Sequence, residues 1–288
     1  MYSEISYTSD DGLRLFARDY PAASGAAHLP VICIHGLTRN SADFEDVAPW
    51  IAAQGRRVIA LDVRGRGNSD YDPKPDRYTP VVYANDVITL AHALGIERAV
   101  FIGTSMGGLI TMTLAVRKSS LIAAAVLNDV GPALSERGLS RIRSYTGKGE
   151  QFTSWQQAAD YISGINMVAF PANTPQEWER WARRAFREER DGTLAMRYDP
   201  NIAVPIRANK LRATSMGAHF AFRRLARRRP TLLIRGGLSD LIEPEQANAM
   251  RAAAPRMLYA EVPGIGHAPM LSEPAAQDAL RSFLDSVD

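Results

Sequence analysis

The strongest constraint in this sequence is a serine placed between an apolar strand and a helix. The apolar run Ala99–Ile102 leads into Gly103-Thr104-Ser105-Met106-Gly107, and a helical stretch follows to Lys118. Strand and helix approach closely in such a turn, so small residues are needed on both sides of a serine that is held exposed in strained backbone. An ordinary serine in a glycine-rich turn is the alternative. The context favours Ser105 as a nucleophile, with the free Met106 N–H at the helix start as an oxyanion donor.

A serine hydroxyl needs a base that removes its proton, and His267 is the best candidate among the five histidines. It lies in the loop 263–269, after the predicted strand Met257–Val262, where the carboxyl ends of parallel strands meet. A loop histidine that makes only surface hydrogen bonds is the alternative. We therefore predict His267 as the general base.

Two aspartates could orient this histidine. Asp240 follows the predicted strand Thr231–Arg235 and precedes His267, which gives the chain order Ser, Asp, His. Asp129 ends the preceding strand and could reach the same imidazole, or it could start the turn before Gly131. The chain order favours Asp240, with Asp129 as the alternative acid.

A second oxyanion donor is expected in the loop after the strand Val31–Ile34. Gly36 lets the backbone turn so that the Leu37 N–H can face the site opposite Met106. We expect His35 to support this loop by hydrogen bonding. The charges of the segment 62–70 are expected to form a structural ion-pair network near the same edge.

The pattern of apolar segments predicts an α/β fold. Two alternating runs, Glu4–Thr8 and Leu13–Tyr20, indicate an antiparallel hairpin. Short apolar runs separated by helical stretches then indicate a parallel sheet covered on both faces. The further strands are expected at Val31–Ile34, Arg57–Leu61, Ala99–Ile102, Ala123–Leu127, Thr231–Arg235 and Met257–Val262, and the helices at Ser41–Ala53, Val81–Leu94, Ser105–Lys118, Pro244–Ala253 and Ala275–Ser286.

Residues 131–229 interrupt this pattern with helical segments, which we expect at Trp155–Gly164, Pro175–Glu189 and Ala208–Arg228. The core is accordingly predicted at 1–130 and 230–288, with 131–229 as a helical cap. The cap's aromatic residues could line a pocket or pack in a core. Its arginines are expected on a solvated face, with recognition of an acidic substrate as the alternative. The residues concerned are Phe152, Trp155, Phe170, Trp178 and Trp181, and Arg180, Arg183, Arg184, Arg187 and Arg190.

Composition excludes several other classes of protein. The 288 residues are 46 % hydrophobic and 23 % charged, which is typical of a globular chain, and a net charge of +3 gives little support to a nucleic-acid partner. The basic run 223–229 is expected at a helix end, where cations are favourable. Cys33 lies in an apolar run and is expected to be buried. No signal segment or membrane span is recognised, so we expect a cytoplasmic protein without a membrane partner.

Taken together, these motifs resemble the α/β-hydrolase superfamily, in particular its esterases, enol-lactonases and carbon–carbon bond hydrolases. The resemblance implies an eight-stranded, mostly parallel sheet flanked by helices, with an inserted helical cap. A serine at position 105 argues against the epoxide hydrolases and haloalkane dehalogenases of this fold, which carry an aspartate there. The matching segments are His35-Gly36, 62–70, Gly103–Gly108, Asp240 and Gly266-His267.

The leading hypothesis is a hydrolase that cleaves a small ester, thioester or lactone through an acyl-enzyme on Ser105. A carbon–carbon bond hydrolase of aromatic ring-fission products, in which a cap arginine would bind the substrate carboxylate, is the runner-up. A non-catalytic protein that binds a small molecule is the alternative from another class. A small-molecule substrate is the expected partner, and no cofactor or metal is expected. The sequence leaves open the substrate, its chain length and a homo-oligomeric state.

Overall fold

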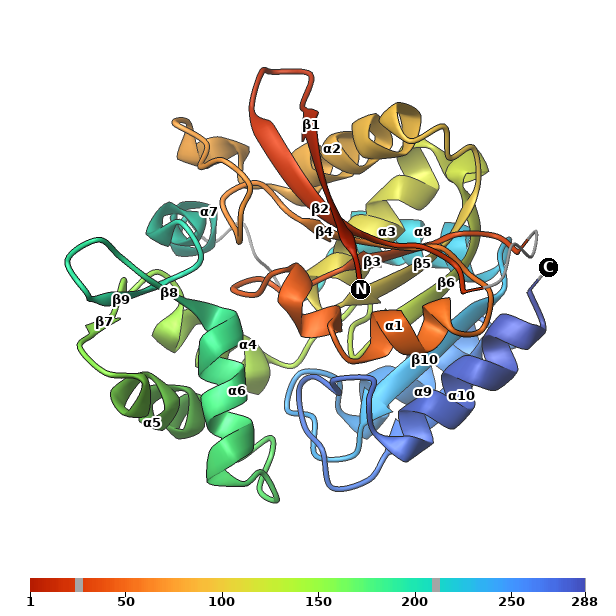
Figure 1. Cartoon of the computed structure of the whole chain (residues 1–288). Coiled ribbons are helices and arrows are strands. Elements are labelled where there is room, and N and C mark those ends of the chain that lie inside the picture. Colours follow the sequence, from red (N-terminus) through yellow and green to blue (C-terminus); the bar gives the residue numbers. More distant parts are fainter. Residues whose placement is uncertain (24–27, 209–212, 288) are drawn as a thin grey trace.

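The computed structural model of the chain describes residues 1–23, 28–208 and 213–287 around a central sheet (Figure 1). Eight strands lie in the order β1-β2-β4-β3-β5-β6-β10-β11. Strand β2 pairs antiparallel with β1 and β4, and the other neighbours pair in parallel. The predicted mostly parallel eight-stranded sheet is confirmed. Its strands are β1 (Ser3–Thr8), β2 (Arg14–Tyr20), β3 (Val31–Ile34), β4 (Val58–Asp62), β5 (Ala99–Thr104), β6 (Ile122–Asn128), β10 (Thr231–Gly236) and β11 (Leu258–Val262).

Helices cover both faces of the sheet because its central strands are apolar on both sides. In β5, Phe101 packs into one buried cluster while Val100 and Ile102 pack into the other. Helices α1 and α10 cover the Ile102 side, and α2, α3, α8 and α9 contribute to the Phe101 side. These helices are α1 (Val47–Ala52), α2 (Pro80–Ala93), α3 (Met106–Arg117), α8 (Met216–Ala226), α9 (Pro244–Ala253) and α10 (Pro274–Asp285).

The predicted hairpin and parallel strands are present, and only their ends differ. The helix expected over Ser41–Ala53 is divided into a 3₁₀ turn, Ser41–Phe44, and helix α1. The Asn40 side chain caps this turn by accepting the Ala42 N–H. Further 3₁₀ turns lie at Pro75–Arg77, Ser119–Leu121 and Pro200–Ala203.

After β6, the chain from α4 to α7 forms a lobe beside the carboxyl ends of the strands, shown mainly in green at the left of Figure 1. It contains helices and a second, three-stranded sheet in the order β7-β9-β8. A purely helical cap was expected, so this sheet is a correction. The elements are α4 (Glu136–Tyr145), β7 (Gln151–Phe152), α5 (Trp155–Asn166), α6 (Pro175–Ala185), β8 (Phe186–Glu188), β9 (Leu194–Met196) and α7 (Val204–Arg207).

Two predicted cap helices are shorter in the structure. The helix expected to reach Glu189 ends at Ala185, because residues 186–188 pair antiparallel with β9. The helix expected from Ala208 begins at Met216, where Ser215 caps it, and residues 209–212 lie outside the described residues. Helix α8 packs against α3, so it belongs to the layer that covers the sheet.

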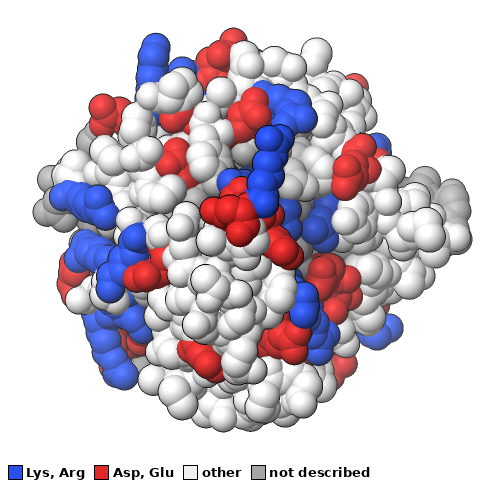
Figure 2. Space-filling model, turned by 60° about the vertical axis from the view of Figure 1, so that its left-hand side comes forward, with Lys and Arg blue, Asp and Glu red and all other residues white. Residues whose placement is uncertain are grey.

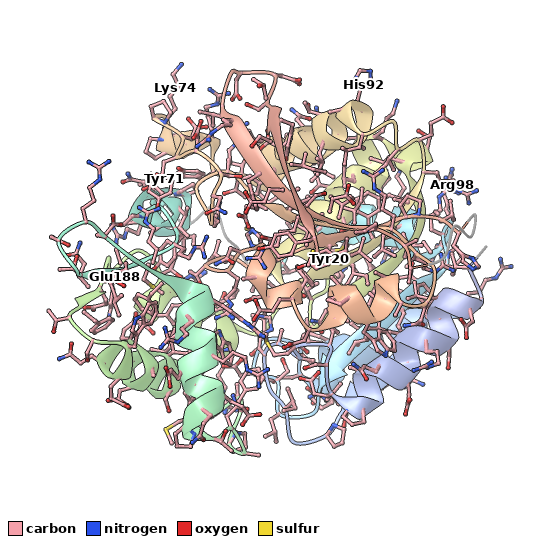
Figure 3. The ribbon with its side chains drawn as sticks, viewed as in Figure 1. Tyr20, Tyr71, Lys74, His92, Arg98 and Glu188 are labelled. Carbon is pink, nitrogen blue, oxygen red and sulfur yellow. The ribbon has the colours of Figure 1, made fainter. Side chains whose placement is uncertain are left out.

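The cap has its own aromatic packing. The indole rings of Trp178 and Trp181 stack with centroids 5.5 Å apart, and Phe170 meets Trp181 edge to face at 4.8 Å. The hairpin β8–β9 also contacts the core, where the Arg187 guanidinium lies 5.8 Å from the centre of the Tyr71 ring. Figure 3 shows Tyr71 on the same side of the molecule as Glu188 of this hairpin.

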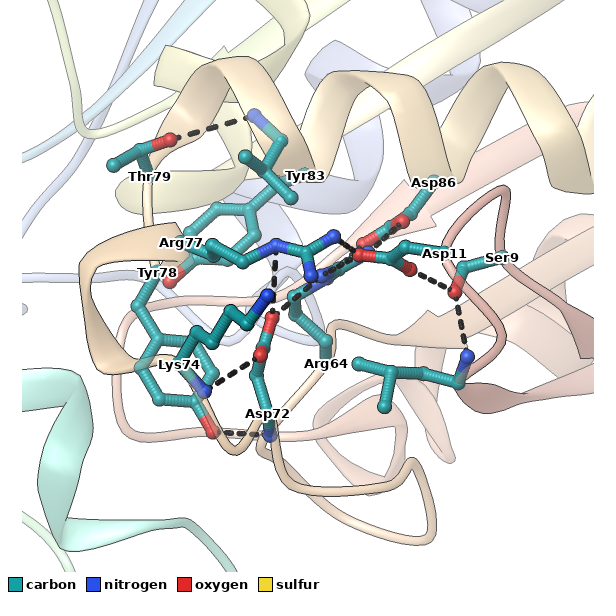
Figure 4. A network of polar contacts seen from close by, with 12 residues as sticks. Ser9, Asp11, Arg64, Asp72, Lys74, Arg77, Tyr78, Thr79, Tyr83 and Asp86 are labelled. Carbon is teal, nitrogen blue, oxygen red and sulfur yellow. Dashed lines mark hydrogen bonds and ion pairs between the residues drawn. The ribbon is translucent and has the colours of Figure 1, made fainter.

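A buried ion-pair network fixes the loop that follows β4 (Figure 4). The Arg64 guanidinium contacts Asp72 at 2.7 Å, Asp11 at 2.8 Å and Asp86 at 2.6 Å. Asp72 lies in the loop itself, Asp11 in the β1–β2 turn and Asp86 in helix α2. Arg77 also pairs with Asp11. The ion-pair network expected near residues 62–70 therefore joins three parts of the core.

Charges of both signs are mixed on the face shown in Figure 2, where Lys and Arg side chains lie beside Asp and Glu side chains. In the described parts of the chain, every helix is too short or too polar to cross a bilayer.

Candidate active site

Ser105 lies in a sharp turn between β5 and α3 at the carboxyl edge of the sheet. Its backbone has φ +51° and ψ −114°, a conformation that non-glycine residues rarely adopt. A Cβ atom on Gly103 would lie 2.5 Å from the Gly107 backbone, and one on Gly107 would lie 2.0 Å from the Ile34 carbonyl oxygen. Strand and helix can therefore meet here only because both positions are glycine.

His267 faces Ser105 from the loop after β11. The Ser105 Oγ lies 2.9 Å from His267 Nε2 and can donate its proton to that nitrogen. The side chain of His267 is 8 % exposed. The structure thus brings together the predicted nucleophile and base, although they lie 162 positions apart in the chain.

Asp129 holds the other side of the imidazole. Its Oδ2 lies 2.7 Å from His267 Nδ1, and its side chain is fully buried. The same carboxylate accepts the Gly236 N–H at 3.0 Å and the Ser239 hydroxyl at 2.5 Å. A carboxylate only accepts hydrogen bonds, so Nδ1 carries the imidazole proton and Nε2 is free to accept the proton of Ser105.

The prediction that Asp240 bonds to this imidazole is therefore wrong. Asp240 pairs instead with Arg141 of the cap helix α4, at 2.5 Å to Nε and 2.7 Å to Nη2. Burial would raise the pKa of Asp240, but the hydrogen bonds and charge of Arg141, together with His267, outweigh burial and lower it. The alternative acid, Asp129, occupies the position beside His267.

The loop after β3 lies against the nucleophile. A Cβ atom added to Gly36 would be 3.8 Å from the Ser105 Cβ, and Leu37 lines the cavities that contain Ser105. His35 is fully buried, donates from Nδ1 to the Gly36 carbonyl at 2.7 Å and accepts the Val63 N–H at 3.0 Å through Nε2. Burial lowers the pKa of His35 to about 4, so this imidazole is neutral and supports the loop.

Arg66 is a site residue that the sequence reasoning did not single out. Its guanidinium is fully buried and donates from Nε to the Leu37 carbonyl at 2.9 Å. It also donates to the Tyr83 hydroxyl at 2.9 Å and lies 3.6 Å from the Met106 sulfur. One side chain therefore contacts both residues expected to supply the oxyanion donors. Its glycine-flanked position in the segment 62–70 was the only signal available in the sequence.

The cap completes the walls of the site. Trp181 lines a cavity at Ser105, whereas Trp178 and Phe170 pack against the Trp181 ring. Arg184 binds Glu45 at 2.7 Å and Asp46 at 2.6 Å, so this cap arginine pairs with the core instead of lying on a solvated face. Among the described residues, no cluster of three or more His, Cys, Asp or Glu side chains could hold a metal ion.

A sequence profile described as the alpha/beta hydrolase fold matches residues 30–274. The chain belongs to the α/β-hydrolase family. The match covers six of the eight strands of the central sheet and all of the cap, so the family assignment does not rest on the serine motif alone. The expected superfamily is confirmed.

Individual α/β hydrolases are similar over most of their length. A 3-hydroxybutyrate-oligomer hydrolase from Cupriavidus necator is 36 % identical over 85 % of this chain and 84 % of its own. A 2-(acetamidomethylene)succinate hydrolase from Mesorhizobium japonicum is 25 % identical over 90 % of this chain and 87 % of its own. The crystal structure of an α/β hydrolase from Novosphingobium aromaticivorans superposes with a TM-score of 0.92 at 41 % identity, over 99 % of both chains. The chain is thus similar to hydrolases that differ in substrate.

Proposed function

We propose that this α/β hydrolase is a serine hydrolase that cleaves an ester, through an acyl-enzyme on Ser105. The observation that supports the proposal is the unbroken line of hydrogen bonds from Ser105 through His267 to the buried Asp129. In this arrangement, Asp129 holds the imidazole in the tautomer that can accept the serine proton. Asp129 takes the role that the sequence had favoured for Asp240.

The reaction proceeds in two halves. Ser105 attacks the ester carbonyl while His267 takes its proton, and the N–H groups of Leu37 and Met106 stabilise the oxyanion. His267 then gives the proton to the leaving alcohol. A water molecule, activated by the same imidazole, attacks the acyl-enzyme and releases the acid.

The ester is favoured over a thioester or a lactone by the relative from Cupriavidus necator, which acts on 3-hydroxybutyrate oligomers. Such oligomers are joined by ester bonds between the acid of one unit and the hydroxyl of the next. The carbon–carbon bond hydrolase considered earlier required a cap arginine that is available to bind a carboxylate. Arg184 is engaged with Glu45 and Asp46, and Arg183 pairs with Glu179, so these side chains give that alternative no support.

The test is reaction of the purified chain with a fluorophosphonate and with p-nitrophenyl butyrate. Wild type is expected to be labelled at Ser105 and to hydrolyse the ester. Ser105→Ala should abolish labelling and lower turnover by about 10³-fold or more while keeping the unfolding temperature. A wild-type chain that binds esters without turnover would instead indicate a non-catalytic binding protein.

A further inference from the structure

Two cavities of different chemistry meet at Ser105. The first has a volume of about 80 Å³, and we call it the polar pocket because Arg39, Asp43, Tyr145, Asn166 and His267 line it beside apolar residues such as Phe44, Ile165 and Trp181. The second, the apolar pocket, has a volume of about 240 Å³ and is lined in part by Leu109, Val130, Leu134, Leu139, Ile206 and Leu241. Ser105, Leu37 and Ile142 line both pockets. A substrate bound at the serine therefore has two distinct places for its two halves.

The position of His267 indicates which half occupies which pocket. This imidazole must deliver a proton to the leaving alcohol oxygen, so the alcohol has to lie on its side of Ser105. His267 lines the polar pocket together with Pro269 of its own loop, and it does not line the apolar pocket. The alcohol half therefore belongs in the polar pocket, and the acyl half in the apolar pocket.

The apolar pocket is suited to an acyl group without polar substituents. Its volume exceeds the roughly 150 Å³ of an apolar cavity that holds a benzene ring. Few polar groups reach this pocket, and each has a protein partner: Tyr78 lies 2.5 Å from Asp199, Tyr83 accepts a hydrogen bond from Arg66 at 2.9 Å, and the Thr79 hydroxyl accepts the Val82 N–H at 3.4 Å. Most of the lining is apolar, so a hydroxyl on the acyl chain would exchange water for mainly apolar contacts, which is unfavourable.

The polar pocket is suited to an alcohol without a negative charge. Arg39 is the cation of its lining, and Asp43 binds this guanidinium at 2.8 Å and 2.6 Å. The guanidinium also stacks over the Trp181 ring at 4.4 Å. Because Asp43 compensates its charge, Arg39 offers little to a substrate carboxylate but keeps a polar surface for a neutral alcohol.

The cap helix α4 carries this change of polarity across the site. Leu139 lines the apolar pocket, Ile142 lines both pockets, and Tyr145 lines the polar pocket. Residues three positions apart lie on one face of a helix, so a single face of α4 covers the serine from its acyl side to its alcohol side. Burial raises the pKa of the Tyr145 hydroxyl, which remains neutral and able to donate a hydrogen bond.

We infer that the substrate is an ester of an unsubstituted apolar acid with a neutral, polar alcohol. This inference rests on the proposed function and goes further, because it separates this chain from a hydrolase of hydroxy-acid oligomers. In such oligomers the acyl half carries a polar group, which the mainly apolar lining of its pocket disfavours.

The experiment compares p-nitrophenyl acetate, butyrate, hexanoate and 3-hydroxybutyrate as substrates of the wild-type chain. Each added methylene group should raise kcat/KM by up to about fourfold while it fits the pocket. The kcat/KM for the butyrate should exceed that for the 3-hydroxybutyrate by about tenfold. Butyrate esters of glycerol and of glycolic acid compare a neutral with a charged alcohol half, and the glycerol ester should be preferred.

A matched pair of variants assigns the two pockets. Ile206 and Ile165 are both half-buried, and they line the apolar and the polar pocket respectively. Ile206→Trp should lower the ratio of kcat/KM for the hexanoate to kcat/KM for the acetate by about tenfold or more. Ile165→Trp should leave the ratio of kcat/KM for the hexanoate to kcat/KM for the acetate unchanged. It should lower kcat/KM for esters of bulky alcohols.

The possible failures are distinguishable. If the wild type is neither labelled by a fluorophosphonate nor active on any ester, the proposed function itself fails. If it is labelled and hydrolyses the acetate, but prefers the 3-hydroxybutyrate or shows no dependence on chain length, only the inference fails. An exchange of the two variants' effects would also overturn it. The wild-type series decides the acyl preference even if a tryptophan variant does not fold.

Discussion

Replacing Asp129 by asparagine tests the hydrogen-bond line at its buried end. The Gly236 N–H donates to Oδ1 and His267 Nδ1 lies at Oδ2, so an asparagine that keeps its oxygen towards Gly236 must turn its amide NH₂ towards the imidazole. Nδ1 then has to accept a hydrogen bond, and the ring proton moves to Nε2. In that tautomer His267 cannot take the proton of Ser105.

The expected loss in kcat/KM is on the order of 10⁴-fold, as for the corresponding change in the best-studied serine protease. This factor corresponds to about 5 kcal/mol of transition-state stabilisation. Steady-state hydrolysis of p-nitrophenyl butyrate measures it, and the rate of fluorophosphonate labelling should fall in parallel. The unfolding temperature reports whether the loss of charge has disturbed the fold.

Asp240→Asn is the matched control. It removes a carboxylate at the end of the neighbouring strand, but this carboxylate faces Arg141 and not the imidazole. We expect kcat/KM to fall by less than about tenfold, since the lost ion pair makes no contact with the imidazole. A large loss in Asp240→Asn with near-normal activity in Asp129→Asn would refute the assignment of the acid.

Three further changes probe the support of the site. Burial lowers the pKa of His35 to about 4, whereas the imidazole of the unfolded chain binds a proton near pH 6.5. The neutral, buried imidazole therefore contributes to the free energy of unfolding in full above pH 6.5, and this contribution falls by about 3 kcal/mol as the pH drops to about 4. The free energy of unfolding in urea should therefore fall less steeply towards acid in His35→Asn, and an unchanged slope would contradict this. Arg66→Lys should lower kcat by about tenfold or more with little change in KM, since the lysine cannot reach the Leu37 carbonyl and the Tyr83 hydroxyl together. An unchanged kcat in a folded variant would exclude a positioning role for Arg66. Gly107→Ala places a Cβ 2.0 Å from the Ile34 carbonyl oxygen and should therefore lower the unfolding temperature by more than a few degrees. A smaller decrease would show that the turn can relax.

The sequence predicted the serine and the histidine because each is marked by its local surroundings. Ser105 is marked by glycines in a strand-to-helix turn, and His267 by a loop after the last strand. The acid has no such mark. Asp129 and Asp240 follow the neighbouring strands β6 and β10, so both reach the same region of the sheet edge.

The choice between the two aspartates depends on distant contacts. Asp129 turns inward with a φ of +54°, a left-handed conformation that the sequence around it does not specify. Asp240 is held away by Arg141, which lies 99 positions earlier in the chain. Helix α4 itself was missed, although its three-residue spacing of Leu139, Ile142 and Tyr145 was visible in the sequence.

The His267 loop is attached directly to the cap. The Gly266 N–H donates to the Ala169 carbonyl at 2.6 Å, and a Cβ on Gly266 would lie 2.7 Å from the Ala169 Cα. This contact limits how caps can be exchanged between relatives. A chimera that replaces the cap without reproducing the backbone at Ala169 would leave the loop of the general base unsupported. Such a transplant would alter the rate of proton transfer as well as the choice of substrate, so cap and histidine loop have to be transferred together.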